Sequence, residues 1–230
     1  MAPPAAEGRW SRLGRRILSA AVLAPPALAA VYVGTPYFDG LVALAVVILL
    51  WEVARTSGIA RGETRTLWGW GALLYVVGAG LAALWLRSAP AIGRDIVFWI
   101  IAVTVATDCG AYAIGRAIGG PKLAPRLSPG KTWAGAVGGL AAGAVLGAVM
   151  PFATVLGGGI AAVGASLCLS AVAEAGDLVE SAFKRRFGAK DMGRLLPGHG
   201  GLADRLDSVM AAMIAVALGR LVIEGGGLAW

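Results

Sequence analysis

The chain alternates long apolar runs with short polar segments, and this pattern predicts the fold. A helix needs about 20 apolar residues to cross a bilayer. Seven runs approach or reach that length, at residues 17–33, 41–53, 67–86, 96–114, 135–149, 152–173 and 209–223. The first contains Pro25-Pro26, so we expect a kink or break there. Because the runs lack the alternation of membrane β-strands, the pattern predicts an all-α, polytopic integral membrane protein with about seven transmembrane helices.

Composition supports a membrane protein and argues against other classes. Hydrophobic residues make up 58% of the 230 residues and charged residues 14%, and the mean hydropathy is +0.76. These values are too apolar for a soluble domain of this size. Cys109 and Cys168 lie in apolar runs without metal-ligand spacing, so neither a disulfide framework nor a zinc site is expected. We expect a single transmembrane domain over residues 1–230, with the N-terminal spans in 1–95 and the polar motifs in 96–230.

The net charge of +7 comes mainly from basic segments on one side of the predicted membrane. If the N-terminus is cytoplasmic, seventeen of the twenty Lys and Arg residues fall on the cytoplasmic side, as the positive-inside rule requires. Anionic lipid also attracts such segments. Because no aromatic-rich recognition module accompanies the charge, we expect no nucleic-acid binding. The topology places the most charged stretch, residues 176–208, at the cytoplasmic face.

That stretch holds five of the thirteen acidic residues, six of the twenty basic residues and the single histidine. If the preceding helix continues past Ala173, then Glu174, Asp177, Ser181 and Lys184 share one helix face. Glu180 and Lys184 form an i,i+4 pair. Ionised carboxylates at the edge of an apolar span cost roughly 2.5–3.5 kcal/mol each, and a divalent cation would offset this. The alternative is a solvated helix end with ordinary salt bridges.

Asp204 and Asp207 repeat the carboxylate spacing at the start of the last span. Such a pair can also serve only the helix dipole. Two helix ends with converging carboxylates, joined by a basic loop, favour a metal and phosphate site. The loop adds cations and glycines that can approach an anion, namely Lys184, Arg185, Lys190, Arg194, Gly198, Gly200 and Gly201. His199 lacks a second histidine, so we expect it to hydrogen-bond a phosphate or a carboxylate.

A second polar cluster lies between residues 108 and 132. Asp108, Tyr112 and Arg116 follow helical spacing and form one polar stripe. Ser128, Lys131 and Thr132 precede the next helix, whose N-terminus suits an anion. The segment lacks the first glycine of a Walker A loop. The alternative is a basic loop placed for topology alone.

Taken together, these residues resemble a known family, the phosphatidate cytidylyltransferases, also called CDP-diacylglycerol synthases. The resemblance covers roughly residues 96–208. Its ordered pattern comprises Asp108, Tyr112, Arg116, Lys122, Ser128, Lys131, Thr132, Ser181, Lys184-Arg185, Lys190-Asp191, His199-Gly200-Gly201, Asp204-Arg205 and Asp207. The chain departs from the family at Ala134, where an acidic residue is common, and at Glu174, where glutamine is common.

The resemblance implies transfer of the cytidylyl group of CTP to phosphatidate, giving CDP-diacylglycerol and pyrophosphate in phospholipid biosynthesis. It implies Mg²⁺ at Asp177 and Asp204, with Asp207 as a further ligand, and leaves open a second, monovalent cation. Glu180 and Asp191 are then ligands or orienting groups. Phosphate binding falls to Lys184, Arg185, Lys190 and Arg205, with Ser128, Lys131 and Thr132 facing the same cleft.

The implied setting is a bacterial inner membrane, with CTP, phosphatidate and the bilayer as partners and a homodimer left open. Two other functions stay open at this point. One is a related CTP-dependent transferase that acts on another lipid phosphate. The other is an ion-coupled membrane transporter whose ion path uses Asp108, Glu174 and Asp177.

Overall fold

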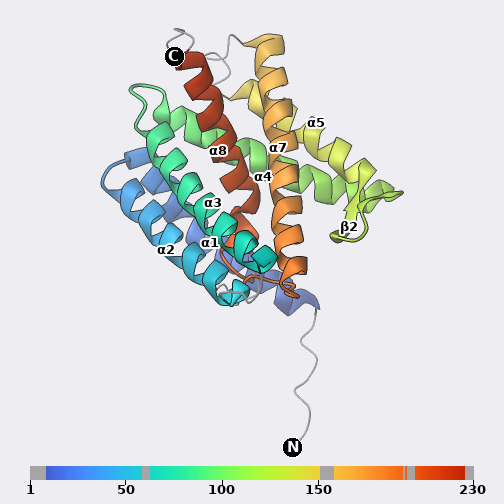
Figure 1. Cartoon of the computed structure of the whole chain (residues 1–230). Coiled ribbons are helices and arrows are strands. Elements are labelled where there is room, and N and C mark those ends of the chain that lie inside the picture. The colour runs from blue at the N-terminus through green and yellow to red at the C-terminus, as the bar shows by residue number, and fades with distance from the viewer. Residues whose placement is uncertain (1–8, 59–62, 151–157, 194, 196–199, 226–230) are drawn as a thin grey trace, which may run out of the picture.

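The computed structural model describes residues 9–58, 63–150, 158–193, 195 and 200–225. Helices dominate this part of the chain (Figure 1). They are α1 (Arg9–Val33), α2 (Tyr37–Ser57), α3 (Glu63–Arg87), α4 (Gly93–Ile118), α5 (Trp133–Val149), α7 (Gly159–Arg186) and α8 (Ala203–Gly225). The all-α class is confirmed.

The number of full-length spans among the described residues is five rather than seven. By length and composition, α2, α3, α4, α7 and α8 can each cross a membrane. The apolar part of α1, Ala21–Val33, and all of α5 are shorter. Helix α1 is continuous, with Pro25 and Pro26 inside it, so the break considered from the sequence does not occur.

The two helix ends that carry the charged stretch form as expected. Helix α7 continues past Ala173 to Arg186, and α8 begins at Ala203, one residue before Asp204. The start of α1, the end of α2, the start of α3 and the end of α7 all lie toward the lower end of Figure 1. This arrangement agrees with the expectation that these segments lie on the same side of the membrane.

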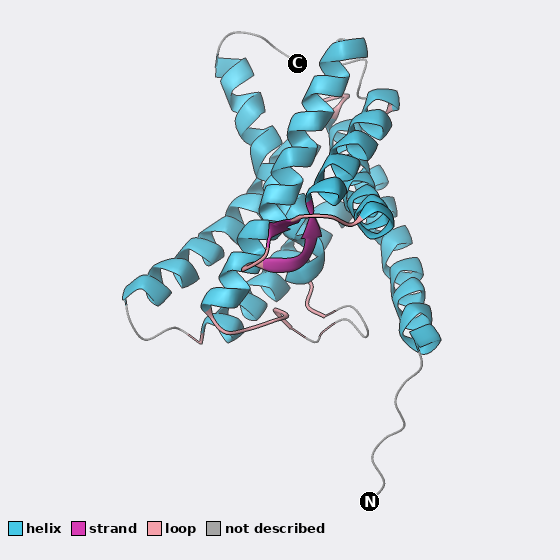
Figure 2. Ribbon diagram, turned by 90° about the vertical axis from the view of Figure 1, so that its right-hand side faces the viewer, coloured by secondary structure: helices cyan, strands magenta, loops and turns pink. Residues whose placement is uncertain are grey.

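The polar loop between α4 and α5 contains a β-hairpin that the sequence pattern did not predict. Strand β1 (Lys122–Ala124) pairs antiparallel with β2 (Ser128–Thr132), and Lys122 lies opposite Thr132 (Figure 2). The second strand contains Pro129 and Gly130, which are poor strand formers, so local propensity gives no sign of it. Thr132 then caps α5, because its Oγ1 accepts a hydrogen bond from Gly135 N at 3.1 Å.

Glycines along one face of α5 let it pack closely between α4 and α7. A Cβ on Gly143 would lie 2.1 Å from Ser170 Oγ, and one on Gly147 would lie 2.1 Å from Ser166 Oγ. Thr107 of α4 also donates to Ser170 of α7 across this contact, at 2.9 Å. Small residues favour such approach in membranes, where no hydrophobic force draws helices together. The packing brings the start of α5 and its preceding strand against α7.

A buried apolar cluster joins α2, α3, α7 and α8 at the end of the protein where α7 stops. It includes Leu49 and Val53 of α2, Val76 of α3, Phe183 of α7 and Met210 of α8. The cluster fixes α7 and α8 relative to α2 and α3, so the polar groups at the two helix ends sit on a packed base.

Candidate functional site

Three carboxylates from α7 and α8 converge. One oxygen of each of Asp177, Glu180 and Asp207 lies within 4.8 Å of the others, and all three residues are partly buried. Like charges this close repel unless a proton or a cation compensates. Glu180 Oε1 is buried and has no hydrogen-bond partner among the described residues. A hard divalent cation such as Mg²⁺ takes oxygen ligands, so this set of donors fits one.

Asp204 is engaged differently, although it lies one turn before Asp207. Its Oδ1 accepts a hydrogen bond from Lys184 Nζ at 2.9 Å, and its Oδ2 accepts from Gly201 N at 2.8 Å and Met192 N at 3.0 Å. Asp204 therefore holds together the segment that leads into α8. Of the ligands and orienting groups implied by the family resemblance, the structure brings together Asp177, Glu180 and Asp207.

Lys184 sits between the two carboxylate groups. Its Nζ lies 2.5 Å from Glu180 Oε2 and 2.9 Å from Asp204 Oδ1. Only 14% of the lysine side chain is exposed, so these ion pairs are shielded from water. Shielded pairs are screened less by salt than surface pairs. The ammonium group of Lys184 thus places one positive charge beside the carboxylate cluster.

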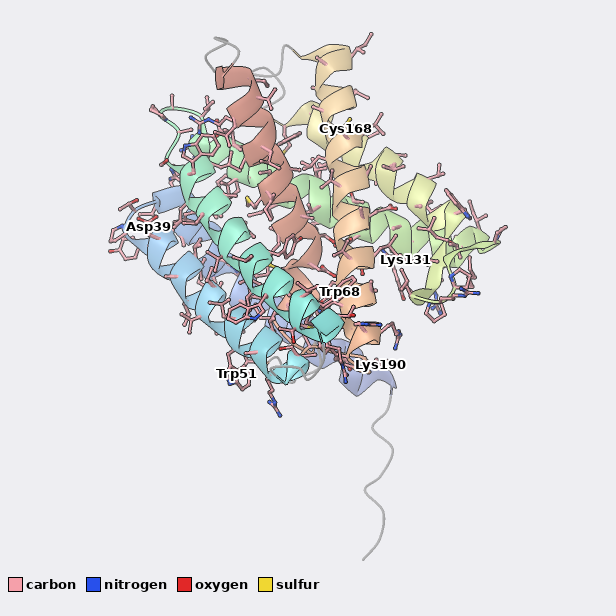
Figure 3. The ribbon with its side chains drawn as sticks, viewed as in Figure 1. Asp39, Trp51, Trp68, Lys131, Cys168 and Lys190 are labelled. Atoms are coloured by element: carbon pink, nitrogen blue, oxygen red, sulfur yellow. The ribbon has the colours of Figure 1, made fainter. Side chains whose placement is uncertain are left out.

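The second polar cluster meets the first through Lys131. Its Nζ lies 2.7 Å from Asp177 Oδ2 and donates a hydrogen bond to Glu174 O at 3.4 Å. Arg185 Nε donates to Leu127 O at 3.3 Å, which ties the end of α7 to the hairpin. Figure 3 labels Lys131, which extends from β2. Lys131 of the hairpin therefore lies beside Asp177 of α7, on the side of the converging carboxylates.

Hydroxyl groups orient two of the carboxylates. Ser181 Oγ donates to Asp177 Oδ1 at 3.5 Å from one turn further along α7. Asp207 Oδ1 accepts from Ser208 N at 2.8 Å and lies 3.4 Å from Ser208 Oγ. Because the spacing of three and four residues places these groups on one helix face, the sequence pattern anticipated the contact within α7.

The remaining predicted residues differ in their surroundings. Asp108 of α4 is exposed and lies in electrostatic range of Asp177, Asp207 and Lys131. Gly200 has a positive φ of 88°, and a Cβ there would lie 2.9 Å from Asp204 Oδ2. The exposed residues of the predicted set are Tyr112, Arg116, Lys190, Asp191 and Arg205. Ser128 is partly buried, and Thr132 is the buried cap of α5. His199, Arg194 and Gly198 lie outside the described residues.

Glu174 does not join the converging carboxylates. Its Oε1 is buried without a hydrogen-bond partner in the described part of the chain. A Cβ on Gly139 of α5 would lie 2.6 Å from that oxygen, so the side chain faces the contact between α7 and α5. The acidic residue at this position therefore adds negative charge behind Lys131 rather than a third ligand oxygen on α7.

Glu52 of α2 is a further buried carboxylate at the site, and it was not predicted from the sequence pattern. This side chain is fully buried, its Oε1 accepts from Leu202 N at 2.9 Å, and its Oε2 accepts from Ala203 N at 2.8 Å. These amides belong to the start of α8, where backbone N–H groups lack helical partners. Thr56, one turn later on α2, donates to Met192 O at 3.0 Å. The available signal was a lone glutamate near the end of an apolar span.

The glycines of the segment before α8 make room for this carboxylate. A Cβ on Gly193 would lie 2.5 Å from Glu52 Oε1, and one on Gly201 would lie 2.8 Å from it. Both distances are shorter than real Cβ contacts. Gly193 and Gly201 are therefore needed for close approach to Glu52, in addition to any role in binding an anion.

The fold and this site define an integral membrane protein in which carboxylates and lysines cluster where two membrane-spanning helices meet. Residues 70–222 match the cytidylyltransferase family, and the chain belongs to this family. Glu52 lies outside the matched residues.

Relatives named phosphatidate cytidylyltransferase occur in several bacteria. The Brucella suis protein is 48% identical over 146 residues, which cover 63% of this chain and 54% of the relative. The Mycobacterium leprae protein is 46% identical over 59% of this chain and 43% of the relative. The Staphylococcus haemolyticus protein is 40% identical over 60% and 54%, respectively. The chain spans about half the length of the curated relatives it matches.

Proposed function

We propose that the protein transfers the cytidylyl group of CTP to phosphatidate, releasing pyrophosphate and forming CDP-diacylglycerol. The observation that carries the proposal is the meeting of Asp177, Glu180 and Asp207 beside Lys131 and Lys184 at the ends of membrane helices. The names of the relatives supply the substrates. The basic segments on the same side support a site at the cytoplasmic face of the inner membrane.

The reaction needs little proton transfer. A phosphatidate phosphate oxygen attacks the α-phosphorus of CTP, the bond from that phosphorus to the bridging oxygen breaks, and pyrophosphate leaves with the electron pair. The attacking phosphate monoester is already anionic near neutral pH, so no general base is required. The main task of the protein is to bring two anions together and to stabilise the charge on the leaving group.

The carboxylate cluster and the two lysines suit these tasks. Asp177, Glu180 and Asp207 would hold Mg²⁺, which shields phosphate charge and stabilises the departing pyrophosphate. Lys131 and Lys184 would bind phosphate oxygens in exchange for part of their present contacts with Asp177 and Glu180. Lys131 comes from the hairpin and Lys184 from α7, so a substrate between them is held from two sides.

The test is incorporation of radiolabelled CTP by the purified protein in lipid nanodiscs. We expect pyrophosphate release only when phosphatidate and Mg²⁺ are both present. A panel of other lipid phosphates separates phosphatidate from a different acceptor. Ion flux in liposomes without nucleotide, together with no lipid-dependent turnover of CTP, would contradict the proposal and favour the transporter.

A further inference from the structure

An apolar cavity of about 400 Å³ lies between α3, α7 and α8. Its mouth includes Leu67 of α3 and Val179 of α7, whose side chains are 71% and 55% exposed. Its deeper walls are buried side chains of four elements and the segment after α7, namely Val53, Val76, Phe183, Met192, Ala203 and Met210. Cavities of this size hold small molecules and single apolar groups. Trp68, labelled in Figure 3, forms part of the α3 wall.

The cavity is continuous with the carboxylate cluster. Glu180 lines it and also belongs to the group with Asp177 and Asp207. Tyr75 lines it as well, and its hydroxyl donates to Asp207 O at 3.5 Å. Apart from these two groups, the lining side chains are apolar. A molecule that fills this space therefore has a long apolar part and a polar head beside Glu180.

We propose that the cavity holds one acyl chain of the lipid phosphate, and that its α3 wall determines which acyl chains are accepted. The inference rests on the proposed function, because the phosphate head is placed at the carboxylate cluster. A chain can enter between Leu67 and Val179 from the side, so the lipid need not leave the bilayer. The head would then lie within reach of Lys184, which contacts Glu180.

Two glycines of α3 provide a matched pair of variants. Gly71 lines the cavity, and a Cβ added there would meet nothing within 4 Å. Gly78 lies two turns further along the same face, has equally open space and does not line the cavity. Leucine at either position adds the same volume to the same helix, but only Gly71→Leu would fill the space that we assign to the acyl chain.

The first experiment compares kcat/KM for phosphatidates with a series of acyl chain lengths. Gly71→Leu should lower kcat/KM for long chains relative to short chains by about tenfold, the factor expected when about two methylene groups lose burial. The KM for CTP should stay unchanged, and Gly78→Leu should behave as wild type. Trp68→Ala should have the opposite effect and favour bulkier chains. Equal loss for all chain lengths, or the same selectivity in all variants, would overturn the proposal.

A second experiment tests the cavity without turnover. A phosphatidate with a diazirine at the end of one acyl chain should crosslink to α3 and α7 at the cavity walls, and Gly71→Leu should abolish this labelling. A diacylglycerol with the same modified chain serves as the control. Equal labelling by this neutral probe would show that only bulk lipid fills the cavity, which overturns the inference. Selective labelling by the phosphatidate without CTP turnover would instead leave the cavity assignment standing and contradict the proposed reaction.

Discussion

Asp204 and Asp207 lie one turn apart at the start of α8, yet their surroundings differ. Asp204 accepts from Lys184 and from two backbone amides, so its carboxylate holds protein groups in place. One oxygen of Asp207 instead lies within 4.8 Å of an oxygen of Asp177 and of an oxygen of Glu180. Asp204 is thus saturated by protein donors. In the other group, three carboxylates converge, and Lys131 and Lys184 pair with two of them, Asp177 and Glu180. The comparison shows that two aspartates one turn apart in one motif can have different surroundings, one satisfied by backbone amides and one placed among other carboxylates.

The largest effect is expected from Asp207→Asn and Asp177→Asn. Each change removes a charged oxygen that we propose as a Mg²⁺ ligand, so turnover should fall by at least about 10³-fold. The Mg²⁺ concentration needed for half-maximal activity should rise. Steady-state release of pyrophosphate during an Mg²⁺ titration measures both quantities. Asp39→Asn is the control, since Asp39 is a partly buried side chain at the start of α2 that accepts a hydrogen bond from Thr35 Oγ1 at 2.9 Å. A rate near wild type in either variant would argue against the metal assignment.

Asp204→Asn should have a smaller effect on turnover, about tenfold, and a clear effect on stability. An asparagine keeps one oxygen but places an N–H₂ group against a backbone donor, so the free energy of unfolding should fall by about 2 kcal/mol. Thermal unfolding in detergent and the same Mg²⁺ titration measure the two effects. A raised Mg²⁺ requirement with unchanged thermal stability would show that Asp204 is a ligand, and the comparison with Asp207 would then be wrong.

Glu52→Gln tests the contact between α2 and the start of α8, next to Asp204. Its amide can accept from only one of the two N–H groups at the start of α8, so we expect a loss of about 1.5 kcal/mol in the free energy of unfolding. Thr56→Val, which removes one hydrogen bond to Met192, should cost about 1 kcal/mol. Thr56→Ser keeps the hydroxyl and is the control. Thermal unfolding that is unchanged in Glu52→Gln would contradict this role.

Lys122→Ala should have the smallest effect. The Lys122 side chain is exposed on β1, and the strand pairing with Thr132 uses the backbone. Substitutions at such positions usually change stability by less than about 0.5 kcal/mol, so turnover should stay within about twofold of wild type. The CTP incorporation assay checks this. A large loss would place the hairpin side chains in substrate binding together with Lys131.

Periodicity anticipated the local parts of the site. The spacing of Asp177, Ser181 and Lys184 determines their common helix face once α7 continues past Ala173. The spacing of Asp204 and Asp207 is equally regular, but it does not distinguish their surroundings, because those depend on the amides of Met192 and Gly201. Contacts between groups far apart in sequence decide which carboxylate is satisfied by the protein.

For other features, the local sequence did not indicate the structure or the partner. The hairpin contains Pro129 and Gly130, which disfavour strands, yet its two strands pair between α4 and α5. Glu52 contacts amides about 150 positions away in the chain, and a single glutamate in an apolar run does not indicate its partner. Each of the seven predicted apolar runs overlaps a helix of the described residues, but only five of these helices are long and apolar enough to cross a membrane, because the apolar parts of α1 and α5 are shorter.

Because Glu52 of α2 accepts hydrogen bonds from the start of α8, the motif of residues 177–207 depends on a helix outside it. A fragment that starts at residue 70, where the family match begins, would lack Glu52 and leave the amides of Leu202 and Ala203 without their acceptors. Grafting the motif onto other membrane helices would therefore need an acidic side chain at the same depth, facing the incoming turn of α8.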